Sequence, residues 1–117
     1  MQEKEKIPGT IRISDEVVAI CAVNVIQRMK GVSRLHSNIM DNILNTQYSG
    51  VKVSRNNDAV IIDVSIIVDF DVQIPQLAWD VQVNVKKEIE QITGLTVSAV
   101  NIYVQGVGVP DEEEEND

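Results

Sequence analysis

The feature that most constrains the fold is a long alternation of apolar and polar residues from Ala59 to Phe70. Successive side chains of a β-strand point to opposite faces of the sheet, so this pattern predicts a long strand with one apolar face. The apolar face would carry Val60, Ile62, Val64, Ile66, Val68 and Phe70, and the other Ile61, Asp63, Ser65, Ile67 and Asp69. A half-polar second face indicates a sheet that helices cover on one side only.

The segment before this strand is expected to pair with it. Val51–Ser54 also alternates, and Arg55–Asp58 supplies turn-forming residues between the two runs. This arrangement predicts a β-hairpin.

Two further strands are expected near the ends of the chain. Gly9–Ile13 alternates and predicts a short first strand. Leu95–Val104 predicts the last strand, in which the apolar residues change phase near Ser98 and Ala99. A β-bulge at this point would reconcile the two phases.

Two helices are expected between these strands. Ser14 is a suitable N-cap for a helix that runs on toward Gly31. Pro75 and Gly94 are suited to begin and end the second helix. Its apolar residues recur at steps of three or four, which is typical of an amphipathic surface helix: Ala78, Val81, Val85, Ile89 and Ile92.

The first helix is apolar at nearly every position between Val17 and Ile26. A helix that is apolar all round is covered on more than one side. A second copy of the chain could provide one of these covers, and Val18, Ala22 and Val25 are the candidate residues for self-association.

Residues 32–50 are the least regular part of the sequence and are expected to form a long connection. Within them Ile39, Met40, Ile43 and Leu44 have helical spacing. One or two amphipathic turns there would either dock on the core or contact a partner.

Together these elements predict a two-layer α+β sandwich, with a four-stranded sheet and two helices in the order β-α-β-β-α-β. The expected domain spans residues 9–109, between a disordered N-terminus (1–8) and a disordered acidic tail (110–117). Six of the 18 acidic residues lie in the last seven positions, and the rest of the chain carries 12 acidic against 10 basic residues. Nucleic-acid binding needs clustered Lys and Arg, so this charge distribution disfavours it.

The reactive residues give no pattern of an enzyme. His36 is the one histidine and Cys21 the one cysteine, which argues against a zinc site and an internal disulfide. Asp69 and Asp71 would point the same way in a strand, but no calcium-loop pattern follows them. We therefore expect no catalytic residue, no metal and no cofactor.

One polar surface remains as a candidate for binding. Asn101, Tyr103 and Gln105 align with a period of two on the last strand, and Asp63 and Ser65 belong to the half-polar face of the long strand. This surface suits contact with a partner protein, or it is simply a hydrated sheet face.

The chain is expected to be cytoplasmic. Residues 1–8 lack the apolar stretch of a secretory signal. The longest apolar run, Val17–Val23, is far shorter than the roughly 20 residues of a membrane span.

Three segments resemble the alkaline shock protein family, whose members are bacterial envelope stress response proteins, mostly of Gram-positive organisms. They are Gly9–Ile20, the start of the second helix at Ile74-Pro75 with Val81–Lys86, and Gly94–Val107, which ends Asn-Ile-Tyr-Val-Gln-Gly-Val. The likeness spans roughly residues 7–109.

This resemblance implies a small, cytoplasmic, non-catalytic protein of cell-envelope homeostasis that self-associates and is held near the membrane by a separate anchor protein. Some relatives are instead associated with fatty-acid and phospholipid metabolism, so the alternative is a regulatory subunit of a lipid-metabolic enzyme. The Asn-rich stretch from Asn38 to Gln47 and the acidic tail depart from the family pattern.

Overall fold

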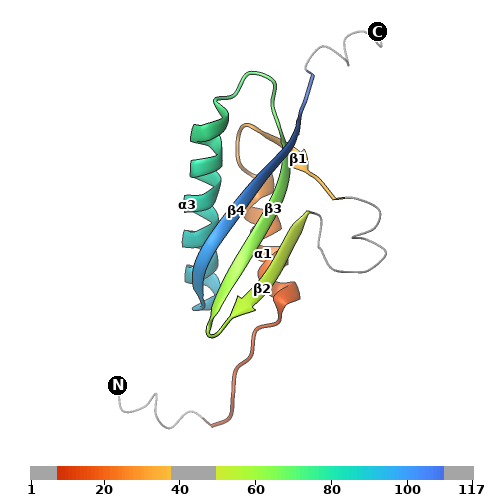
Figure 1. Ribbon diagram of the computed structural model, residues 1–117. Coiled ribbons are helices and arrows are strands. Elements are labelled where there is room, and N and C mark those ends of the chain that lie inside the picture. The colour runs from red at the N-terminus through yellow and green to blue at the C-terminus, as the bar shows by residue number, and fades with distance from the viewer. Residues whose placement is uncertain (1–7, 38–49, 110–117) are drawn as a thin grey trace.

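The computed structural model describes residues 8–37 and 50–109. Four strands form one sheet, and two helices cover one of its faces (Figure 1). The elements are α1 Asp15–Gln27, β1 Val32–Leu35, β2 Val51–Asn56, β3 Ala59–Val68, α3 Ile74–Thr93 and β4 Thr96–Val107. The predicted two-layer α+β class is confirmed. The helical turns expected around Ile39–Leu44, residues 1–7 and the acidic tail lie outside the described residues.

All the other strands pair with β3. β2 is antiparallel to the first part of β3, and β1 is antiparallel to its last part. β4 runs parallel to β3 along the opposite edge, so the sheet is mixed. The hairpin predicted from residues 51 to 70 is confirmed, and its turn has Asn57 at a φ of 59°, a left-handed conformation that asparagine tolerates well.

β1 and β2 meet end to end on the same edge of β3. The N–H of His36 donates to the carbonyl of Ser65 (2.9 Å), and the N–H of Ser65 donates to the carbonyl of Gly50 (2.9 Å). Gly50 has a φ of +88°, and a Cβ atom there would lie 2.5 Å from the carbonyl oxygen of His36. Only glycine fits this junction.

The bulge predicted in β4 is confirmed. Val60 is opposite Val97, but the next residue, Ile61, is opposite Ala99, so Ser98 is the extra residue. The bulge brings the second apolar phase of β4 onto the helix-covered face, where Val100 is buried.

The strand predicted at Gly9–Ile13 is absent, and the fourth strand of the sheet is β1. Both edges of β3 are already occupied, by β4 on one side and by β1 and β2 on the other, which leaves residues 9–13 no place beside it. The end of this segment is held by Arg55, which donates from Nη2 to the carbonyl of Ile13 (2.7 Å) and from Nε to Asp15 Oδ1 at the start of α1 (2.8 Å).

The first helix is covered from two sides within the same chain. α1 contacts α3 and also the strands β1 and β2. Val18 and Ala22 are fully buried, and Val25 is 5% exposed, so the three residues predicted for self-association pack in the chain's own core. The large apolar side chains of α1 that are exposed are Val17 (46%) and Ile20 (48%).

α3 has the predicted start and end. Pro75 lies in its first turn, and Gly94 ends it in the left-handed conformation, with a φ of 77°. Leu77, Val81, Val85 and Ile89 are the buried residues, while Ile92 is 59% exposed. Among the described residues, neither helix has the length and hydropathy needed to cross a membrane.

The burial of Val18 leads to a direct prediction. Val18→Glu places a carboxylate without a partner in the core, at a cost of several kcal/mol, which is comparable to the whole stability of a small domain. We expect circular dichroism to show an unfolded chain. The matched control is Ile20→Glu on the same helix, which should fold because Ile20 is 48% exposed. A folded, monomeric Val18→Glu protein would contradict this packing.

Candidate functional site

The predicted polar surface lies on the sheet face opposite the helices. Strand register places Asp63 opposite Asn101 and Ser65 opposite Tyr103. Asn101 donates from Nδ2 to Asp63 Oδ1 at 2.8 Å, which links β3 and β4 through side chains. Four of the five predicted residues are therefore neighbours.

Gln105 lies apart from this register. Ile66 is opposite Val104 and Ile67 is opposite Gly106, so Gln105 is the extra residue of a second bulge, and its side chain is exposed. Tyr103 is 49% exposed and offers an aromatic ring and a hydroxyl group to a partner.

The other reactive side chains are scattered over the fold. Asp69 and Asp71 are exposed in the loop after β3, His36 follows β1, and Cys21 is half-buried in α1. Across the described ranges, no three His, Cys, Asp or Glu residues gather as metal ligands would.

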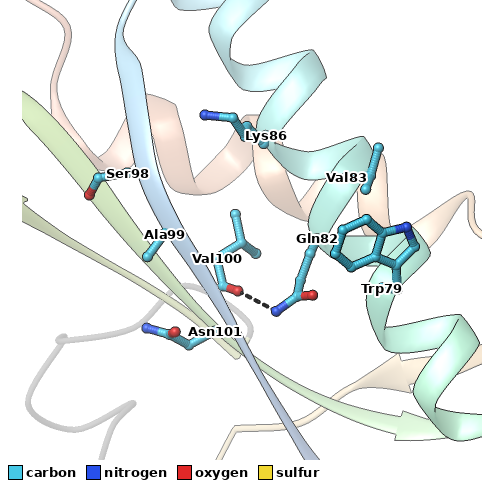
Figure 2. Close-up of a pocket in the computed structure, with 8 residues that line it drawn as sticks. All are labelled: Trp79, Gln82, Val83, Lys86, Ser98, Ala99, Val100 and Asn101. Carbon is cyan, nitrogen blue, oxygen red and sulfur yellow. Dashed lines mark hydrogen bonds between the residues drawn. The ribbon is translucent and has the colours of Figure 1, made fainter.

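A second surface was not predicted: the groove between α3 and the outer edge of β4. Three side chains of α3 form hydrogen bonds with the backbone of this edge, and Figure 2 shows the one from Gln82 to Val100. Gln82 Nε2 donates to the carbonyl of Val100 (2.9 Å), and Lys86 Nζ donates to the carbonyl of Val97 (2.7 Å). Glu90 Oε2 accepts from the N–H of Val97 (2.9 Å). Side chains of α3 thus bond both backbone groups of Val97 and the carbonyl of Val100 on the outer edge.

Glu90 is the charged centre of this arrangement. It accepts the Val97 N–H and also pairs with Lys86 Nζ at 3.0 Å. The backbone hydrogen bond from Val97, and then the Lys86 ammonium, hold the pKa of Glu90 below its ordinary value.

The hydrogen bonds from α3 to the outer edge of β4 end at Val100. The carbonyl of Val100 points outward to Gln82, and backbone direction alternates along a strand, so Ile102 and Val104 also present their N–H and C=O groups outward. At the far end Gly108 N donates inward to the carbonyl of Val68 (2.7 Å). Along Ile102–Val104 the described side chains of α3 make no hydrogen bond to the edge.

Exposed apolar side chains lie beside this edge. Trp79 is 61% exposed and Val83 is 43% exposed, one turn apart on α3. They line a cleft of about 370 Å³ with Val100 and Asn101, and Figure 2 shows the indole ring beside Gln82. Exposed tryptophan is enriched among the residues that contribute most to protein interfaces. One sequence signal for this surface existed, since Trp79 and Val83 are spaced by four residues outside the apolar stripe of α3.

Residues 3–109 match the alkaline shock protein 23 family, which is described by a cell envelope-related function. The chain belongs to this family. The alkaline shock protein family named from the sequence is thereby confirmed.

Several family members are similar over most of their length. The chain is 35% identical to the uncharacterized protein YloU of Bacillus subtilis, over 86% of this chain and 90% of that protein. It is 28% identical to the uncharacterized protein YqhY of the same organism, over 92% of this chain and 83% of that protein. It is 29% identical to the uncharacterized protein Spy1614 of Streptococcus pyogenes, over 89% of this chain and 92% of that protein. No solved structure matches.

The lowered pKa of Glu90 predicts an acid-sensitive contact. A carboxylate with a depressed pKa in the folded state stabilises the fold above its unfolded pKa, and this contribution is lost as the pH falls through the folded value. Glu90→Gln should therefore lower the free energy of unfolding at about pH 7, and the difference from the wild type should shrink as the pH falls through the lowered pKa of Glu90. Urea unfolding of both proteins at a series of pH values measures this difference in the free energy of unfolding. Glu88→Gln on the same helix is the control, and a Glu90→Gln deficit independent of pH would contradict the assignment.

Proposed function

We propose that this chain is a non-catalytic binding protein of cell-envelope homeostasis, which acts by self-association and by contact with a partner protein near the membrane. The observation that carries the proposal is the exposed pair Trp79 and Val83 beside the outer edge of β4. The family's cell envelope-related function supplies the biological setting.

Two surfaces divide this work. The groove between α3 and β4 has an apolar rim and a strand edge, a combination that favours contact with a folded chain. On the open sheet face, the side chains of Tyr103 and Gln105 are exposed beside the hydrogen-bonded pair Asn101 and Asp63. Ser65 lies on β3 opposite Tyr103. This polar surface suits contact with a second protein. We propose a membrane-anchored protein as that partner.

The partner is tested by affinity purification of the tagged protein from its native cells, with membrane and soluble fractions analysed separately by mass spectrometry. We expect a membrane-anchored protein in the membrane fraction, and its loss with Asp63→Ala, which alters the open sheet face on β3 and leaves the outer edge of β4 unchanged. Recovery of a soluble enzyme of lipid metabolism instead would support the alternative role of regulatory subunit. Recovery of neither a membrane-anchored protein nor an enzyme of lipid metabolism would contradict both proposed partners.

Trp79 gives the sharpest prediction for self-association. Truncating a tryptophan that acts as an interface hot spot costs at least about 2 kcal/mol, so Trp79→Ala should weaken self-association about 30-fold. Its melting temperature should stay close to that of the wild type, since the side chain is exposed. Sedimentation velocity over a range of concentrations measures the self-association of the wild type and of Trp79→Ala.

The matched control is Ile92→Ala, an equally exposed apolar residue near the other end of α3. It should associate as the wild type does. A wild-type chain that stays monomeric at every concentration would refute self-association, and equal weakening by both variants would refute the role of Trp79.

A further inference from the structure

We propose that two copies of the chain associate through the outer edges of their β4 strands, which pair antiparallel around Tyr103 and join the two sheets into one. This inference rests on the proposed self-association and names the surface that performs it. The strand edge, rather than the apolar first helix, is then the site of contact.

The first ground is the unprotected edge. Long edge strands normally carry charges, prolines or covers that prevent pairing with other chains. β4 has 12 residues and pairs with β3 alone among the described strands. Gln82, Lys86 and Glu90 cover its backbone only as far as Val100, so the open part begins at Asn101. Figure 1 shows β4 leaving α3 as it runs toward the C-terminus.

The second ground is charge, which selects a second copy as the occupant. No charged residue occurs between Glu90 and Asp111, although 24% of the chain is charged. A strand that pairs with its own copy brings identical residues together, and like charges opposite each other are destabilising. An uncharged strand avoids this repulsion on every register.

The acidic residues at the end of the sequence also favour the antiparallel direction. Asp111–Asp117 follows β4 in the chain and holds six acidic residues. Antiparallel pairing places the two copies of Val109, the last described residue before this acidic sequence, at opposite ends of the joint, while parallel pairing would place them at the same end. A closed two-fold contact also uses one patch of surface twice, as most homodimers do.

The register follows from the direction of the backbone groups. Ile102 and Val104 present N–H and C=O outward, so Ile102 of one copy can exchange both hydrogen bonds with Val104 of the other. This places the two Tyr103 residues opposite each other at the two-fold axis, as a pair without mutual hydrogen bonds. Such pairs have the shortest Cα–Cα separation, about 4.5 Å. Trp79 lines the cleft beside Asn101, at the border of the paired stretch.

The test is a disulfide at the axis. Tyr103→Cys in a Cys21→Ser background should form a covalent dimer within minutes to hours in oxidised glutathione, because the expected Cα separation suits a disulfide. The control is Thr96→Cys in the same background, since Thr96 is also exposed on β4 but lies seven positions from the axis. It should stay uncrosslinked. Equal crosslinking of both variants, or of neither, would overturn the pairing.

A second variant tests the same contact without a crosslink. Tyr103→Lys leaves the core intact because Tyr103 is 49% exposed, but it places two ammonium groups at the axis. We expect dimerisation to weaken at least about tenfold and to recover partly in about 1 M salt, where the Debye length falls to about 3 Å. Thr96→Lys should have no such effect.

The outcomes separate the two proposals. A wild-type chain that is monomeric at every concentration refutes self-association and the β4 joint together. A wild-type dimer that neither crosslinks at position 103 nor responds to Tyr103→Lys leaves self-association standing and refutes the joint, which would direct attention to Val17 and Ile20 on α1.

Discussion

The whole sheet is assembled on β3, and the burial of its apolar face under α1 and α3 is the constraint on which the other elements depend. Val60, Ile62, Val64 and Ile66 are fully buried on that face. Each such side chain contributes about 1.5–3 kcal/mol when it leaves water. Since β1 and β2 share one edge of β3 and β4 takes the other, no further strand can join the sheet through β3.

This arrangement determines where the chain can contact other proteins. β4 has one edge on β3, and its outer edge is covered by side chains of α3 only along its first part. The bulge at Ser98 places Val97 within reach of Glu90 and Val100 within reach of Gln82. Beyond these contacts the strand is uncharged, and Trp79 stands exposed beside it. The surface available for binding thus follows from the pairing of β4 with β3 and from the partial cover of its outer edge by α3.

Much of the fold could be predicted from the sequence because the signals are local. The alternation in β3, the cap at Ser14, the Pro75 and Gly94 boundaries of α3 and the phase change at Ser98 each report on a few neighbouring residues. Pairing is not local, so the sequence predicted a strand at residues 9–13, although both edges of β3 are occupied by other strands. For the same reason β1, only four residues long, could not be distinguished from a connection.

The candidate site was predicted in part. Period two was enough to group Asn101 with Tyr103 and Asp63 with Ser65, but the bulge that displaces Gln105 has no clear signal in a uniformly apolar or neutral strand. The covering of α1 by α3 depends on how helices pack in three dimensions, so Val18, Ala22 and Val25 could not be assigned to the core from composition alone. The bonds from α3 to the edge of β4 depend on the same packing.

The most direct test of the account is amide hydrogen exchange of the wild-type protein at increasing concentration. The outward N–H groups of Ile102 and Val104 should be without a strand partner in the monomer and hydrogen-bonded to the second copy in the dimer. Their exchange should slow as concentration rises, while the amide of Val97, already bonded to Glu90, should be protected throughout. Fast exchange at Ile102 and Val104 at concentrations where the protein is dimeric would contradict the claim.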